Sequence, residues 1–149
     1  MQSVQENIIV DLILEHSKRI HLIEPLQGFE NVQDFVLSIN PKEAPLIWLE
    51  AEDQARISFV VVDPFLFFNY QPEFHNQEID LLRINNEEDM LILCITNISK
   101  LHKKDMTVNL VSPLVINWPL NVGKQLLLKN HEDYSMEQRL LSSQLKEAA

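Results

Sequence analysis

The strongest constraint on the fold of this chain is its series of short apolar runs, which are rich in Val, Ile, Leu and Phe. Turn signals such as Asn40-Pro41 and Asn121-Val122-Gly123 lie between them. Parallel strands would need crossover helices of about a dozen residues, and the sequence has no room for several. We therefore expect an all-β fold, a small antiparallel β-barrel or sandwich with one or two short helices. The predicted strands are Ile8–Leu14, Arg19–Ile23, Phe35–Ile39, Leu46–Glu50, Ile57–Val62, Leu91–Ile98, Thr107–Val111, Leu114–Ile116 and Gln125–Lys129.

Two short helices are compatible with the sequence. One is predicted at Gln77–Arg83, after Asn76 as an N-cap. The other is predicted to begin at Ser135, which forms a capping box with Gln138 ahead of a leucine-rich stripe. We expect a single β domain over residues 1–134 and a C-terminal helical tail over 135–149. The predicted core includes Phe59, Val61, Ile92, Cys94 and Ile116.

Charge and length exclude several classes of protein. The 149 residues suit one domain, and a 46% apolar content can bury a core. A net charge of −10 disfavours direct binding to nucleic acid and favours a basic partner. The N-terminal residues lack the pattern of a secretory signal, and no apolar run is long enough to span a bilayer. We expect a cytoplasmic protein that is monomeric when free.

Catalytic and metal-binding patterns are missing from the sequence. None of the five histidines stands in a zinc-binding spacing, and two glycines cannot form a phosphate loop. Cys94 lies in an apolar run and is interpreted as a core residue. We therefore expect no enzyme activity, no metal and no cofactor. A small hydrolase is the alternative from another class, and a carboxylate with a raised pKa in a deep pocket would support it.

Two segments carry more specific information. Asp63–Tyr70 holds three of the seven phenylalanines, and strand alternation would place Phe65 and Phe67 opposite Leu66 and Phe68. The other segment, Asn109–Asn117, is interrupted by a proline at position 113, which favours a sheet edge or a bulge that a partner could approach.

A third segment, Pro25–Glu30, is predicted to form a turn at Gly28. In their order along the chain, the three segments resemble the FliW family of flagellar assembly factors. The resemblance covers about residues 18–131. Its motifs are Gly28-Phe29-Glu30, Pro64-Phe65-Leu66-Phe67-Phe68 with Tyr70, Asn109-Leu110, Pro113 to Asn117, Gly123, Gln125 and Leu126–Leu128. The chain departs from the family pattern at Gln27, at Trp118-Pro119, in its opening strand and in its tail from Ser135.

The resemblance implies a barrel-like β fold, no enzyme activity and two protein partners. One is flagellin, and the other is the RNA-binding translational repressor CsrA. In the family scheme, free FliW binds the repressor after flagellin export and lifts the block on flagellin translation. A dedicated cytoplasmic flagellin chaperone without a regulatory arm is the alternative.

The expected partner-binding residues fall into two sets. Flagellin is expected at a groove formed by the aromatic segment and the proline-interrupted edge, which includes Phe65, Phe67, Phe68, Tyr70, Asn109, Pro113 and Asn117. The basic repressor is expected at two acidic groups, which steer its approach. These are Glu50, Glu52 and Asp53, and Glu87, Glu88 and Asp89.

Overall fold

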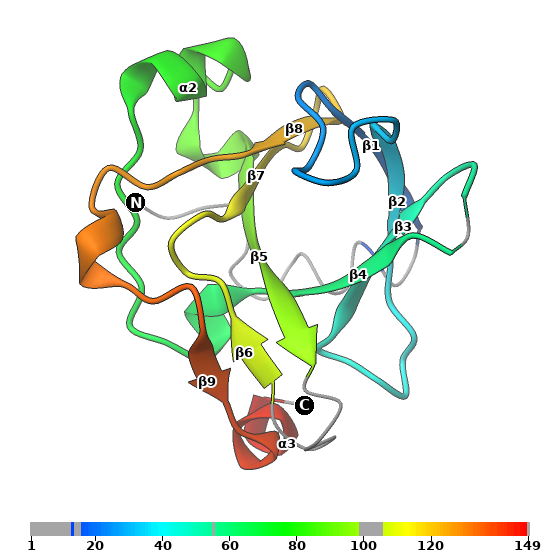
Figure 1. Cartoon of the computed structure of the whole chain (residues 1–149), viewed down its shortest axis with the longest axis vertical. Helices are drawn as coiled ribbons and strands as arrows, with labels where there is room; N and C mark the ends of the chain where they lie inside the picture. Colours follow the sequence, from blue (N-terminus) through cyan, green and yellow to red (C-terminus); the bar gives the residue numbers. More distant parts are fainter. Residues whose placement is uncertain (1–12, 14–15, 55, 99–105, 149) are drawn as a thin grey trace.

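Seven strands form a closed barrel in the computed structural model, which describes residues 13, 16–54, 56–98 and 106–148 (Figure 1). Around the ring the strands follow the order β4-β3-β2-β1-β8-β7-β5, and β5 pairs again with β4. Two further strands, β6 and β9, extend the sheet from the end of β5. The strands are β1 (Lys18–Leu22), β2 (Asp34–Ser38), β3 (Ile47–Ala51), β4 (Ser58–Val62), β5 (Met90–Ile98), β6 (Met106–Val108), β7 (Leu114–Asn117), β8 (Val122–Gln125) and β9 (Gln138–Leu140).

The barrel is mixed rather than wholly antiparallel as predicted. β1 and β8 are parallel, with His21 opposite Val122, and every other pair around the ring is antiparallel. The reason is geometric. An odd number of strands cannot close into a ring with every neighbour reversed, so at least one pair must be parallel. The predicted all-β barrel class is confirmed.

The core consists of two apolar clusters on the two faces of β5. Leu91 and Leu93 point into the barrel, whereas Ile92 and Cys94 point into a second cluster outside it. The second cluster is covered by the segments around α2 (Asn76–Leu81) and by β6 and β9. Burial on both faces explains why the first part of β5, residues 90–95, is a continuous apolar run.

The predicted core is confirmed at four of its five positions. Val61 and Ile116 are fully buried in the barrel, and Ile92 and Cys94 are fully buried in the second cluster. Phe59 is only partly buried and packs against the barrel cluster at its rim.

Most strand boundaries agree with the sequence to within one residue, but the last part of the chain does not. The strand predicted at Gln125–Lys129 lies earlier, at β8, and the one predicted at Thr107–Val111 ends at Val108. Of Ile8–Leu14 the structure describes Ile13 alone, which is helical and buried. The rest of that prediction lies outside the described residues.

The two helices differ from their predictions at their N-terminal ends. In α2, His75 is the N-cap and Asn76 is already helical. No helix begins at Ser135, whose Oγ accepts a hydrogen bond from the Glu137 amide. Gln138 instead begins β9, because its backbone pairs with β6, and the C-terminal helix α3 spans only Ser142–Ala148. Long-range pairing has overridden a local capping pattern.

Candidate partner-binding surfaces

The aromatic segment after β4 is a short helical turn and not the strand that alternation predicted. It begins with the 3₁₀ helix η1 (Pro64–Leu66). The Asp63 carboxylate accepts a hydrogen bond of 2.9 Å from the Phe65 amide, and the proline occupies the first turn. Because the chain turns here, all three phenylalanines, at positions 65, 67 and 68, pack against the second cluster. Leu66 is left 40% exposed.

Tyr70 anchors this segment from within and is not a surface residue. It is 5% exposed, and its hydroxyl donates a 2.7 Å hydrogen bond to the Leu110 carbonyl. Its ring meets that of Tyr134 edge to face at 4.9 Å between centroids. Burial raises the pKa of the Tyr70 phenol well above its usual range. These contacts join the aromatic segment to the two turns that precede β7 and β9.

The segment from Asn109 to Asn117 is not an exposed edge. The Asn109 side chain accepts hydrogen bonds from the amides of Val111 and Ser112, which closes a turn. Pro113 is buried, and β7 is then paired on both sides, with β5 and with β8. The predicted edge is therefore wrong, because the proline stands in a turn between two ladders rather than in a free strand.

Asn117 serves the interior of the protein. Its side chain is 3% exposed and donates to the carbonyls of Leu82 at 2.8 Å and Arg83 at 3.2 Å. It also accepts from the Leu120 amide at 3.2 Å. Asn117 holds the end of α2 and the β7–β8 turn together. Its buried side chain is therefore not available for direct contact with a partner.

A hollow of about 570 Å³ lies beside the small β5–β6–β9 sheet. Asn109 is the one predicted site residue that lines it. Met136, at its edge, is 63% exposed. We call this hollow the trough, and its lining residues are Ile95, Thr96, Asn97, Thr107, Asn109, Ser135, Met136 and Glu137. Sequence reasoning missed most of these residues, although the change from an apolar run to Thr96-Asn97 late in β5 was a signal for an exposed strand end.

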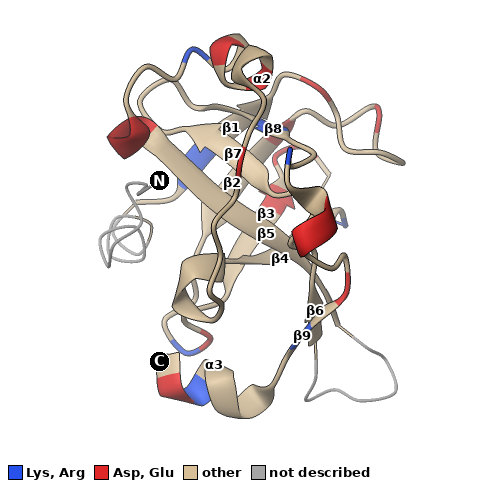
Figure 2. Ribbon diagram, turned by 90° about the vertical axis from the view of Figure 1, so that its left-hand side faces the viewer, with Lys and Arg blue, Asp and Glu red and all other residues tan. Residues whose placement is uncertain are grey.

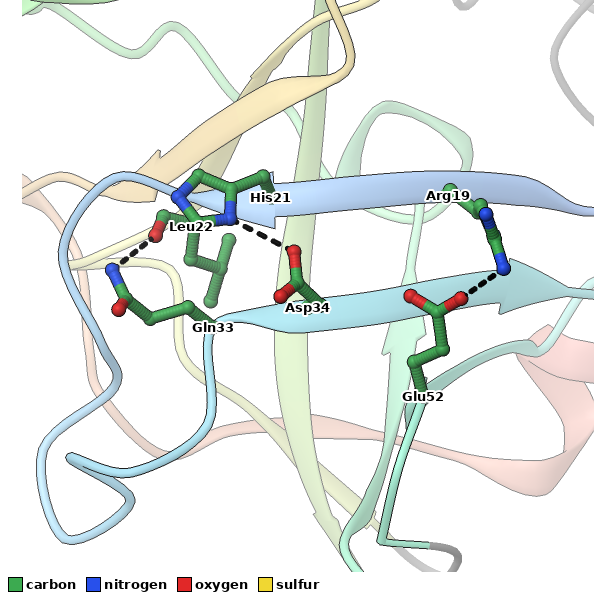
Figure 3. Close-up of polar contacts among 6 residues, drawn as sticks. All are labelled: Arg19, His21, Leu22, Gln33, Asp34 and Glu52. Atoms are coloured by element: carbon green, nitrogen blue, oxygen red, sulfur yellow. Dashed lines mark hydrogen bonds and ion pairs between the residues drawn. The ribbon is translucent and has the colours of Figure 1, made fainter.

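The first acidic group, Glu50, Glu52 and Asp53, is exposed at the end of β3 and just beyond it. Its members are not equivalent. Glu52 forms an ion pair with Arg19 on the neighbouring part of the sheet, as Figure 3 shows. The same view shows the His21 ring facing the Asp34 carboxylate. Nδ1 of His21 lies 2.8 Å from Oδ1 of Asp34, so this carboxylate also has a side-chain partner.

The second acidic group forms the 3₁₀ helix η2 (Glu87–Asp89), which leads into β5. Glu87 and Glu88 are exposed, and the Asp89 carbonyl accepts a 2.8 Å hydrogen bond from the Trp118 amide. Figure 2 shows acidic residues over several parts of the surface, α2 and α3 included. The acidity is therefore distributed and not concentrated in one patch.

The part of the chain that the structure describes holds no group of three or more His, Cys, Asp or Glu side chains that could bind a metal ion. Across those same residues, no helix has the length and apolar character needed to cross a membrane. Burial raises the pKa of the Cys94 thiol, which disfavours the nucleophilic thiolate.

Comparison with known proteins agrees with this architecture. The family described as FliW protein matches residues 3–140. The flagellar assembly factor FliW of Thermoanaerobacter pseudethanolicus is 38% identical over 115 residues, which cover 76% of each chain. The FliW of Magnetococcus marinus is 33% identical over 144 residues, which cover 93% of this chain and 86% of the relative.

A solved structure is similar as well. A crystal structure of the flagellar assembly factor FliW superposes with a TM-score of 0.72 at 28% identity, covering 82% of this chain and 84% of that one. The matched region includes the whole barrel, because the family match extends from residue 3 to the end of β9. The chain therefore belongs to the FliW family of flagellar assembly factors, which are not enzymes.

Proposed function

We propose that this protein acts in the cytoplasm as a flagellar assembly factor that binds flagellin and the translational repressor CsrA, and so couples flagellin synthesis to export. Family membership carries the proposal. The surface supports it in two ways. The trough offers an open, partly apolar surface, and the net charge of −10 suits a basic RNA-binding partner.

The trough is the surface that we assign to flagellin. Its lining mixes apolar groups, such as Ile95 and Met136, with the amides of Asn97 and Asn109. An amphipathic helix could place its apolar face on the former and its polar flank on the latter.

The aromatic segment supports the trough from behind and does not line it. Tyr70 contacts the ring of Tyr134 and the Leu110 carbonyl, and the Leu110 amide in turn donates to the Ser135 carbonyl at 3.1 Å. Ser135 is itself a lining residue. The family-like aromatic run is thereby connected to the binding surface through its packing.

Met136→Asp tests this site. Met136 is 63% exposed, so the change should leave the fold intact while placing a charge where an apolar helix face would lie. We expect flagellin affinity to fall at least tenfold by calorimetry and repressor binding to be retained. Leu120→Asp is the control, since Leu120 is 49% exposed and does not line the trough. Equal flagellin affinity of the two variants would move the site elsewhere.

The acidic groups are assigned to the encounter with the repressor. Exposed carboxylates mainly raise the association rate, and their effect is screened over about 10 Å at 0.1 M salt. Converting Glu50, Glu52 and Asp53 together to amides should slow association and flatten its salt dependence. Stopped-flow measurements at low and moderate salt test this, with Glu87, Glu88 and Asp89 converted in a second variant. If both variants associate with the repressor at the rate of the parent protein, the acidic groups do not contribute to repressor binding.

A dedicated flagellin chaperone is the second candidate. A chaperone of this kind would also bind flagellin at the trough, but its acidic groups would have no role in partner binding. Co-purification of the tagged protein with purified flagellin and, separately, with purified repressor distinguishes the two. Capture of both supports the regulatory function, and capture of flagellin alone supports the chaperone.

A further inference from the structure

A second hollow, of about 440 Å³, lies on the outer face of the barrel over β2, β3 and β4. The strand register places Ser38 beside Trp48 and Glu50 beside Ser58. We call it the Trp48 hollow, and its lining residues are Ser38, Ile39, Asn40, Glu43, Trp48, Glu50 and Ser58.

Strand alternation builds the floor of the Trp48 hollow. Ile47 and Leu49 are fully buried in the barrel, so Trp48 and Glu50 share the outer face of β3. The Trp48 indole N–H donates to the Glu43 carboxylate at 3.3 Å. This contact holds a carboxylate from the β2–β3 connection beside the aromatic ring.

The lining of the Trp48 hollow carries negative charge and no basic residue to neutralise it. It contains two carboxylates, Glu43 and Glu50, and no Lys, Arg or His. Among the described residues, the ion pair in this region involves Glu52, which meets Arg19, and neither lining carboxylate forms one. An aromatic face beside two carboxylates that form no ion pair and two serine hydroxyls is a chemical match for a planar cation.

We propose that the Trp48 hollow binds an arginine side chain of a basic protein partner. A guanidinium can stack on the indole while its N–H groups meet the carboxylates of Glu43 and Glu50 and the serine hydroxyls. A lysine ammonium lacks the planar fork and fits less well. In naming the basic RNA-binding repressor as the source of this arginine, the inference rests on the function proposed above.

Tryptophan fluorescence gives a direct readout, because the chain has two tryptophans and Trp118→Phe leaves Trp48 as the single reporter. The probes are an acetyl-Gly-Arg-Gly-amide peptide and the same peptide with citrulline, the neutral isostere of arginine. We expect the arginine peptide to change Trp48 emission with a dissociation constant on the order of millimolar, and the citrulline peptide to have no effect. Identical responses to both peptides, or no response to either, would overturn the site.

Matched substitutions test the carboxylates. Glu50→Gln and Glu43→Gln should each weaken the arginine peptide about two- to fivefold, as expected for loss of one exposed ion pair. Glu73→Gln removes the same charge from an exposed residue that lies outside the hollow and outside both acidic groups, and should have no effect. Equal effects of Glu50→Gln and Glu73→Gln would show general electrostatics and refute a defined site.

The purified repressor completes the test and separates the two proposals. Repressor binding that shifts Trp48 emission and weakens more in Glu50→Gln than in Glu73→Gln supports both. Repressor binding that leaves Trp48 emission unchanged and weakens equally in the two variants overturns the arginine site and leaves the regulatory function standing. A response to the arginine peptide without any repressor binding supports the site chemistry and refutes the repressor as its partner.

Discussion

Asn117→Ala should destabilise the fold, because the asparagine side chain joins three parts of the chain. The side-chain amide donates to the carbonyls of Leu82 and Arg83, after α2, and accepts from the Leu120 amide in the β7–β8 turn. Alanine would leave these backbone groups without their partner in a site where Asn117 itself is only 3% exposed. Water cannot readily replace the amide there.

The expected magnitude follows from these contacts. Each net hydrogen bond contributes about 0.5–1.5 kcal/mol, so losing three should lower the free energy of unfolding by about 2–4 kcal/mol. With a urea m-value of about 2 kcal/mol/M, the midpoint should fall by about 1–2 M. Asn130→Ala is the matched control. Its side chain also bonds to the backbone, to Glu73 and Gln71, but it is half-exposed, so the loss should be below about 1 kcal/mol.

Asn117→Asp sharpens the argument. The introduced carboxylate keeps an acceptor for the Leu120 amide but cannot donate to the two carbonyls. Burial of the carboxylate beside these carbonyl oxygens should raise its pKa above the unfolded value. When a group has a higher pKa in the folded state than in the unfolded state, its contribution to stability is complete below the unfolded pKa. That contribution is lost as the pH rises through the folded-state pKa. The deficit relative to the parent should therefore be larger at pH 7 than near pH 4. If the urea midpoint of Asn117→Ala lies within about 0.3 M of the parent value, which corresponds to about 0.5 kcal/mol, the stabilising role of the Asn117 hydrogen bonds is refuted.

Three further predictions concern packing inside the barrel and the second cluster. Tyr70→Phe should cost about 1–2 kcal/mol in urea unfolding, because it leaves the buried Leu110 carbonyl without its donor; an unchanged midpoint would contradict this. Gly123→Ala should cost about 1–3 kcal/mol, since its Cβ would lie 3.1 Å from Ile116 Cγ1 and from a backbone oxygen; a thermal melt equal to that of the parent would argue against it. Cys94 should react with a thiol reagent only after unfolding, because it is fully buried and its pKa is raised; rapid labelling of the folded protein would count against its burial.

Local sequence patterns determined the structural class. Short β-branched runs predicted the strands to within a residue over most of the barrel, because alternation and burial act within a few positions of one another. The apolar run around Cys94 predicted a core residue, and Cys94 is fully buried. The ordered motifs also led to the family that the comparisons show.

Tertiary structure alone decided which of the predicted site residues are exposed. Asn117 was predicted as a binding residue, yet its side chain bonds to carbonyls 34 and 35 positions away, which no local pattern can show. The capping pattern at Ser135 does not form a helix, because β9 pairs with β6. The segment predicted as a proline-interrupted edge contains an interior strand, because β8 pairs with β7. The trough likewise brings the end of β5 to Met136. Strand pairing and side-chain hydrogen bonds join residues that are distant along the chain, so the surface left for partners emerges only when the barrel is closed.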